Sequence, residues 1–448
     1  MSSPGLSVER VAPVFFLLLV DILGLTVILP LLHLYAAKFG ATPLEIGLLV
    51  AAFPIAQLVG VPMMGTLSDR FGRKPLLLIS QVTTCASFVL LGLANTLWLV
   101  ILSRVIDGLF GANIATAQAA LTDISSEEER AQALGLTGAA FGIGFVLGPL
   151  ISAISLSFTD RLSIPAFIAA GYSLLSIVLT TVMFKETLPK NARQQTERRT
   201  TPLTALRTLR DPRINLLLVM MFAQQLIFFG FESLLGLFTL SRLGMLGEGN
   251  AYIFVVVGVI LVMVQGRYIG KWSRRYGDHR VAQGALALLS VGLVLLALTP
   301  QQPPLNYIQA RAERALLVQQ AEGEQLTSTI TLPEDTERGL WGVPWLLMAI
   351  VPLSIGAGLI RPSLNTLMTK RVSPLEYGMV LGVSSAFVSA ANATAPLAAG
   401  SLFQNVSPSA PFIVGGVLMG VLFVVSLFVV TAPTTKNRNI SAVKEPTI

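Results

Sequence analysis

Charged residues are scarce in this sequence. Asp, Glu, Lys and Arg make up 12% of its 448 residues, about half the share of roughly 25% in soluble globular domains. Because 53% of the residues are hydrophobic and the mean hydropathy is +0.72, a water-soluble chain of this length could not bury its apolar surface. Apolar runs of roughly 18 or more residues recur along the whole chain, and each is long enough to cross a bilayer as a helix. The sequence therefore predicts an all-α integral membrane protein.

Cysteine and histidine are also rare. Cys85 is the single cysteine, which excludes an internal disulfide, and we expect it to be a small core residue. His33 and His279 lie near the ends of apolar runs and are too few and too scattered for a metal site. The sequence contains no HExxH, GxSxG or phosphate-binding loop. We therefore expect no enzymatic activity, no catalytic residues, no metal and no cofactor, and an ion gradient rather than ATP as the energy source.

Hydropathy predicts twelve membrane-spanning helices. They begin near Val11, Pro43, Pro75, Leu97, Arg130, Ser163, Arg213, Gly249, Val281, Gly342, Glu376 and Pro408. Most of the 31 Lys and Arg residues fall in segments that are cytoplasmic if Met1 is cytoplasmic, so both termini are expected inside a cytoplasmic or inner membrane. The first span has no cleavage site behind it and is expected to be a retained helix. We attribute the net charge of +7 to this bias and to anionic lipid, not to nucleic acid.

The two halves of the chain resemble one another. GTLSDRFGRK (65–74) can be laid on GKWSRRYGDHR (270–280) with an offset of 205 residues. A later segment aligns Gly135 with Gly382 and Pro149 with Pro396 at an offset of 247, and the difference of 42 matches a polar insertion at about 300–341. Two parallel halves related about the membrane normal are typical of one large class of secondary transporter.

These features predict two pseudo-symmetric six-helix bundles. We expect the first bundle at 1–185, a cytoplasmic linker at 186–212, the second bundle at 213–432 and a cytoplasmic tail at 433–448. The insertion contains NYIQARAERALLVQQAEGEQ, a candidate amphipathic helix whose apolar face would hold Ile308, Ala312, Ala315 and Leu316. The insertion is either a solvated spacer or a lid.

The hairpin GTLSDRFGRK between the second and third spans carries four charges in ten residues. Gly65 and Gly72 would allow tight turns and close backbone contact. Asp69 gains nothing from anionic lipid, so we expect it to bind helix N-terminal amides or a basic residue of a neighbouring helix, as a latch. The alternative is a topology anchor alone. The positive-inside rule assigns the anchoring of this loop to Arg70, Arg73 and Lys74.

Five charged residues fall within the predicted spans: Asp21, Arg104, Asp107, Glu232 and Arg361. Each costs roughly 2.5–3.5 kcal/mol near the centre of a membrane helix, so each needs compensation. They lie on spans one, four, seven and ten, and a polar cavity would explain both their tolerance and their spacing. Arg104 and Asp107 are three residues apart and can pair on one helical face. Asp21 has no partner in its own helix, so it is the best candidate for a carboxylate that carries a proton or faces a cation.

Span seven holds a second candidate for this role, Glu232, and the sequence leaves open whether Arg361 neutralises it. The same span carries possible substrate contacts at Gln224, Gln225 and Phe228, which suit a broad apolar ligand. A stripe of Met and Phe is nevertheless more often core or lipid-facing.

Span five is rich in glycine, and its glycine-rich motif ends at Pro149. Gly144 and Gly148 form a small-xxx-small pair that permits close helix contact. The motif is explained either by packing alone or by a flexible, leak-tight interface between the two halves.

GTLSDRFGRK resembles the loop 2–3 signature of the major facilitator superfamily at every position. DILGLTVILPLL in span one, LSRVIDGLFGAN in span four, TDISSEEERAQALG after it and GAAFGIGFVLGP in span five resemble the twelve-helix drug/proton antiporters, in particular the tetracycline-efflux branch. Ser152 and Ala153 replace the usual glycine pair of the span-five motif. The resemblance implies the two-bundle fold, a gating role for Asp69 and a role in proton coupling for Arg104.

The copied hairpin departs from this pattern, because Arg274 replaces the acid and Asp278 replaces a base. In the second alignment Lys370 takes the place of Asp123. We interpret these exchanges as complementary charges of an inner gate between the halves, with two acids facing two bases: Asp69 and Asp123 against Arg274 and Lys370. The alternative is drift of surface charge, since surface ion pairs contribute little.

The expected function is secondary active transport by alternating access. We expect proton-coupled efflux of a lipophilic or cationic small molecule, such as a tetracycline or another drug. The alternatives are transport of sugars, organic acids or lipids by the same fold, or a membrane receptor that no longer transports. The expected partners are the substrate, protons and the lipid bilayer, and we expect a monomer.

Overall fold

A computed structural model describes residues 8–125, 130–159, 161–188, 212–317, 330–371 and 377–430. This part of the chain is helical and contains no strand, and twelve of its helical segments are long and apolar enough to cross a membrane. The predicted count of spans is confirmed. Most of the predicted linker and the whole predicted tail lie outside the described residues.

The first half contains six spans. They are formed by α1 (Val8–Ile28) with the short helices η1 (Leu29–Leu31) and α2 (Leu32–Lys38), α3 (Pro43–Phe71), α4 (Arg73–Gly92), α5 (Leu97–Phe110) with α6 (Asn113–Asp123), α7 (Arg130–Ser157) and α8 (Ser163–Met183). Two of these spans are interrupted. Pro30 has no N–H to continue the helix, and the first span becomes a 3₁₀ turn there. The fourth span breaks at Gly111, whose N–H bonds to the Asp107 carbonyl at 2.6 Å.

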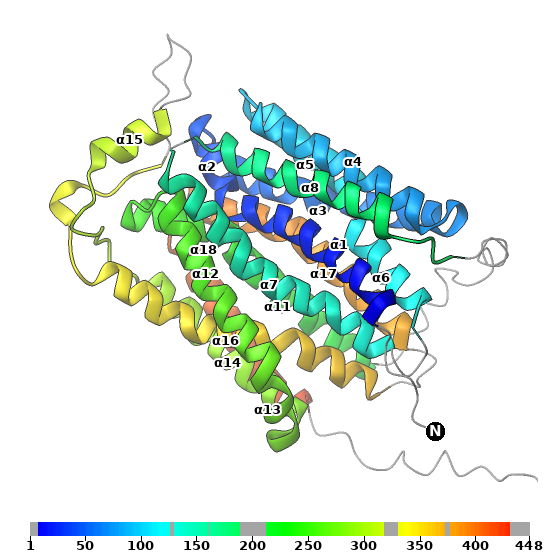
Figure 1. The fold of residues 1–448 in the computed structure, drawn as a ribbon. Helices are drawn as coiled ribbons and strands as arrows, with labels where there is room; N and C mark the ends of the chain where they lie inside the picture. Colours follow the sequence, from blue (N-terminus) through cyan, green and yellow to red (C-terminus); the bar gives the residue numbers. More distant parts are fainter. Residues whose placement is uncertain are drawn as a thin grey trace, which may run out of the picture.

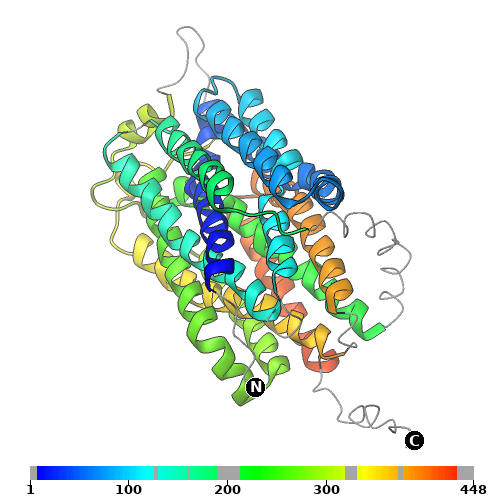
Figure 2. The ribbon, with the colours of Figure 1, turned by 45° about the vertical axis from the view of Figure 1, so that its right-hand side comes forward.

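The second half contains the other six. They are formed by α11 (Pro212–Leu243), α12 (Gly247–Met263) with the π-helical segment η3 (Val264–Tyr268) and α13 (Ile269–Tyr276), α14 (Asp278–Ala297), α16 (Gly342–Thr369), α17 (Tyr377–Asn405) and α18 (Ala410–Val429). In Figures 1 and 2 this half, coloured green to red, lies alongside the blue to blue-green first half. Figure 1 shows α2 and α15 (Gln309–Leu317) at one end, the insertion end, and α6 and α13 at the other, the hairpin end.

The two halves meet mainly along two helix pairs, α3 with α17 and α7 with α12. Both contacts depend on glycine. A Cβ at Gly47 of α3 would collide with the Pro396 carbonyl of α17, and one at Gly400 would lie 2.7 Å from the Pro43 carbonyl. At the second pair, a Cβ at Gly258 would lie 2.7 Å from the carbonyl carbon of Phe145. The backbones of the two halves are therefore in direct contact, as small residues allow in membranes.

The glycine pair of span five packs elsewhere. A Cβ at Gly144 would meet Ile22, and one at Gly148 would meet Thr26, both on α1 of the same half. Thr26 also donates a hydrogen bond to the Gly144 carbonyl at 2.9 Å. The pair, followed by Pro149 within α7, thus fixes α7 to α1, whereas the close backbone contact of α7 with the other half is made at Gly258 of α12. Of the two explanations left open by the sequence, these contacts favour packing within the first half for Gly144 and Gly148.

The insertion folds back onto the insertion end. Ala312 and Leu316 of α15 are buried and α15 contacts α2 of the first half, whereas Ile308 is exposed because it precedes the helix. The Asp335 carboxylate accepts a bond from the first amide of α15, that of Gln309, and another from Arg338 at 2.6 Å. These bonds lower the pKa of Asp335. Because α15 packs against α2, the structure favours the interpretation of the insertion as a lid over its interpretation as a solvated spacer.

The contact between α7 and α12 can be tested by adding one methyl group. Gly258→Ala should destabilise the protein by about 1–3 kcal/mol, because its Cβ meets backbone atoms that cannot rotate away. Gly171→Ala on α8 is the control, since a Cβ there meets nothing within 4 Å. Thermal unfolding of the two purified variants in detergent gives the comparison. Equal melting temperatures would contradict the direct backbone contact.

Candidate functional site

A buried ion pair lies in the interior of the first half. Arg104 and Asp107 of α5 are 3.5 Å apart and almost fully buried, as their spacing predicts. The guanidinium also bonds to Ser87 at 3.3 Å and lies over the Phe88 ring, 5.3 Å from its centroid. Thr84 donates to the Asp107 carboxylate at 2.8 Å. Three residues of α4 therefore hold the Arg104–Asp107 pair in place.

Asp21 of α1 lies beside this pair. Both of its carboxylate oxygens are buried, and neither has a hydrogen-bond partner in the described part of the chain. Gln81 and Ser176 lie next to the carboxylate, and Asp107 is close enough to repel it. Gln81 donates to Ser176 at 2.8 Å, while its own amide oxygen has no donor among the described residues. A charged carboxylate without a partner is costly here, whereas a protonated Asp21 carries no charge into the interior.

Sequence reasoning did not identify the α4 residues of this site. Gln81, Thr84 and Ser87 follow one another at intervals of three in the membrane-spanning helix α4, and all three are buried. Residues at this spacing share one helical face. A polar stripe along a membrane helix was the signal that could have found them.

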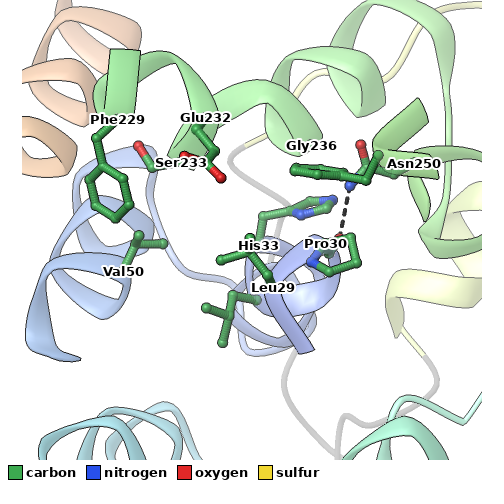
Figure 3. A pocket seen from close by; sticks show the side chains of 11 residues that line it. Leu29, Pro30, His33, Val50, Phe229, Glu232, Ser233, Gly236 and Asn250 are labelled. Atoms are coloured by element: carbon green, nitrogen blue, oxygen red, sulfur yellow. Dashed lines mark hydrogen bonds between the residues drawn. The ribbon is translucent and has the colours of Figure 1, made fainter. Parts of the chain in front are cut away.

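The charged residues of the second half lie apart from this network. Glu232 on α11 lines a small cavity between the halves, together with His33 (Figure 3). Arg361 on α16 is exposed and forms no ion pair with Glu232 in the described structure. The pairing that the sequence left open is therefore absent in this conformation.

The residues predicted to contact substrate on α11 already have partners within the protein. Gln225 donates to Asn392 of α17 at 2.8 Å, and Gln224 donates to the Met221 carbonyl on its own helix at 3.2 Å. Phe228 packs against Phe231, with 5.6 Å between the ring centroids. A ligand bound here would exchange these contacts for its own.

At the hairpin end, Arg73 is the centre of a charged cluster. It binds Asp69 at 2.6 Å and Asp123 at 2.9 Å, and it donates to Ser68 at 3.2 Å. Asp69 thus binds a basic residue of the neighbouring helix, one of the two predicted partners. The N-terminal amides of α4 are capped instead by Glu186, which sequence reasoning missed.

The second half repeats this hairpin. Gly72 and Gly277 both have a positive φ, +105° and +82°, and both donate to the carbonyl of the serine four residues earlier. A residue with a side chain rarely adopts this backbone, which explains glycine at both positions. Gly65 differs, because a Cβ there meets nothing within 4 Å, so the close contact expected at Gly65 is not present.

The charges of the repeated cluster are reversed. Asp278 occupies the position of Arg73 and accepts bonds from Ser273 and Lys370. Lys370 in turn occupies the position of Asp123, so each acid and base has exchanged places with its partner. The two exchanges compensate each other within one half, and this conformation does not use them as pairs between the halves. Drift of independent surface charges does not explain such a matched exchange.

The other basic residues at this end have local roles. Lys74 donates to the Thr181 carbonyl at 2.9 Å, and Arg70 lies over the Phe71 ring at 5.4 Å from its centroid. Arg274 forms no ion pair with Asp69 or Asp123 in the described structure. The gate predicted between the halves is therefore not formed here.

The fold is that of a membrane transporter, and the comparisons with known proteins agree. The family model of the Major Facilitator Superfamily matches residues 14–318 and 337–447, so this chain belongs to that superfamily. It is an integral membrane protein with twelve spans.

The chain is similar to bacterial resistance proteins. It is 25% identical over 405 residues to the tetracycline resistance protein, class B, of Escherichia coli, with 87% of each chain covered. It is 24% identical over 421 residues to multidrug resistance protein 2 of Bacillus subtilis (strain 168), which covers 92% of this chain and 94% of the relative.

Solved structures share the fold. The human organic anion transporter MFSD10 (TETRAN) superposes with a TM-score of 0.64 at 23% identity, covering 94% of this chain and 99% of the other. The nucleoside transporter NupG gives a TM-score of 0.70 at 12% identity, with 96% and 100% covered. At these identities the likeness concerns the fold alone.

The reversed cluster can be tested by charge exchange. Asp278→Lys and Lys370→Asp should each lower the free energy of unfolding, because each single change leaves like charges together. The double exchange should recover about 0.5–3 kcal/mol relative to the sum of the single losses. Thermal unfolding of the three purified variants measures this coupling. Strictly additive losses would show that the two side chains do not interact.

Proposed function

We propose that this protein exports a lipophilic or cationic small molecule in exchange for protons, by alternating access between the two sides of the membrane. The proposal depends on one observation above all. The buried Asp21 carboxylate has no hydrogen-bond partner in the described part of the chain and lies beside the Arg104–Asp107 pair. An ionisable group at membrane depth is functional by default, because it is costly to keep.

The relatives support the direction and the substrate class. The names of the two compared bacterial proteins refer to tetracycline resistance and multidrug resistance. Efflux of an amphipathic drug would produce such resistance. The buried amide and aromatic groups of α11 are compatible with a ligand of this kind.

Asp21 is proposed to carry the proton. A protonated Asp21 is neutral, so it can remain buried beside Gln81 and Ser176 without an opposite charge. When Asp21 loses its proton, we expect its charge to compete with Asp107 for Arg104, the cation that binds Asp107. Because Asp21 lies on α1 and Arg104 on α5, this competition would couple the protonation state to the relative position of the two helices. A cationic substrate would compete with Arg104 in the same way.

We assign the hairpin end to the cytoplasm, with both termini on that side, because it carries most of the basic residues. The division at 186–212 then places a cytoplasmic linker between two bundles that rock as units, in a protein that acts as a monomer. In this orientation the contacts of α15 and α2 close the outer side.

The proton gradient is sufficient as an energy source. One pH unit supplies about 1.4 kcal/mol, and a membrane potential of 100 mV supplies about 2.3 kcal/mol for each charge. Together these allow roughly 100- to 1,000-fold accumulation for one proton exchanged, since each 1.4 kcal/mol is a factor of ten.

Asp21→Asn should abolish pH-driven efflux while leaving the protein folded, because Asn keeps the size of the side chain but cannot carry a proton. Purified protein in liposomes, with an imposed pH gradient and a fluorescent cationic drug, provides the measurement. Glu313→Gln, which removes an exposed carboxylate from α15, is the control. Undiminished pH-driven transport by Asp21→Asn would remove this residue from the mechanism. If only sugars, organic acids or lipids compete for transport, the substrate class is wrong.

A further inference from the structure

A small cavity lies between the two halves near the insertion end (Figure 3). The first half contributes residues around the break at Pro30, and the second half contributes α11 and α12. Its volume is about 20 Å³, enough for one water molecule. The lining is mostly apolar, and its two titratable side chains are His33 and Glu232.

His33 of α2 is held against the backbone of the other half. A Cβ at Gly236 of α11 would overlap the imidazole ring, so only glycine leaves room for it. His33 is 4% exposed, and its Nε2 atom has no hydrogen-bond partner in the described part of the chain. Glu232 precedes Gly236 by four residues and therefore lies on the same face of α11. The two side chains share one cavity, although they belong to different halves.

The cavity exists because the insertion end is closed. The side-chain amide of Asn250 on α12 donates to the Pro30 carbonyl at 2.8 Å, across the two halves. Nearby, a Cβ at Gly247 would lie 2.6 Å from Leu156 and 3.0 Å from Leu34, so the two halves are in tight contact there. When the halves separate at this end, His33 and Glu232 must part and meet water.

We propose that His33, Glu232 and one water molecule form a proton-binding site that is assembled only when the insertion end is closed. A net charge is costly in a cavity of this size, so the closed site holds one proton in total. That proton is on Glu232 beside a neutral imidazole, or on His33 beside a carboxylate. The site is separate from Asp21 and requires alternating access, but it does not require that Asp21 carry a proton.

Proton counting gives the pH dependence of closure. In water a Glu loses its proton above about pH 4.3 and a His above about pH 6.5. Above pH 6.5 the open pair therefore holds no proton, and closure takes one up. Between these two values the open pair already holds one, and closure is independent of pH. Acidification to about pH 6.5 should favour the closed state by up to tenfold for each pH unit.

Other charged groups around this site have their own partners or lie outside the cavity. Glu45 of α3 accepts bonds from Thr42, Arg242 of α11 donates to Ser409, and Arg104 and Asp107 of α5 bind each other. The titratable residues of α2, α12 and α15 that do not line the cavity are Tyr35, Lys38, Glu248, Tyr252, Arg311, Glu313 and Arg314.

The test measures the closure of the insertion end itself and does not depend on a transport assay. Spin labels at Phe158→Cys and Val406→Cys report the separation of the halves at the insertion end, since both positions are exposed, at 86% and 68%. The labelled protein carries Cys85→Ala, which removes the native thiol, and Asp21→Asn, which removes the proton of the proposed transport site. Double electron–electron resonance between pH 5 and 8 then gives the closed fraction in lipid nanodiscs.

The variants His33→Gln and Glu232→Gln should differ in the sign of their response. Between pH 6 and 5 the closed fraction of the parent should stay constant. The ratio of closed to open protein should rise up to tenfold in His33→Gln, in which only the carboxyl group takes up a proton on closure. It should fall up to tenfold in Glu232→Gln, in which only the imidazole titrates and charging it favours the open state.

The same profile in all three proteins would overturn the proposal. So would opposite slopes, with His33→Gln falling and Glu232→Gln rising. His33→Ala and Glu232→Ala must reproduce the slopes of the Gln variants, and they serve where a Gln variant does not purify. Because Asp21 is absent throughout, pH-driven efflux that survives Asp21→Asn would contradict the proposed function without affecting this result.

Discussion

A charge in or near a bilayer has to be neutralised by a residue close to it, because the membrane offers neither water nor mobile ions. This constraint organises both halves of the protein. Arg104 binds Asp107 inside the first bundle, and Arg73 binds two acids at its edge. The second bundle keeps the geometry of the edge cluster and reverses its signs at Asp278 and Lys370. Asp21 is a buried carboxylate of the first bundle that has no such partner among the described residues, and we propose that its protonation therefore affects how the helices pack.

The second constraint is the close contact between the halves. Glycines at Gly47, Gly258 and Gly400 bring backbones of different halves together without side chains between them. Such contacts resist water but contain few polar groups, so they can slide or rock at little electrostatic cost. Titratable groups are found instead at the insertion end, where His33 meets α11. The arrangement separates an apolar seam between the backbones from a contact that, in our proposal, responds to protons.

Much of the fold could be predicted from the sequence, because spans, repeats and turn glycines are local patterns. The twelve spans and the turns at Gly72 and Gly277 are of this kind. Local pairs such as Arg104 with Asp107 follow from helical spacing. Partners that are far apart in the sequence cannot be predicted in this way, because a single sequence does not show which segments lie close together in space. The contact of Gly148 with Thr26 and the shared cavity of His33 and Glu232 join segments far apart in the chain. The sequence also could not show whether Lys370 pairs with an acid of its own half or with an acid of the other half.

The reversed clusters constrain how the halves could have diverged from a common sequence. A single reversal at either partner places two like charges against each other at a poorly solvated helix end. Two routes avoid that state: both codons change together, or the pair first passes through an uncharged intermediate such as serine or glutamine. The serines at Ser68 and Ser273, which already bond to the central residue in each half, can keep such a neutral intermediate hydrogen-bonded. The geometry therefore permits divergence in single steps by way of a hydrogen-bonded, uncharged pair.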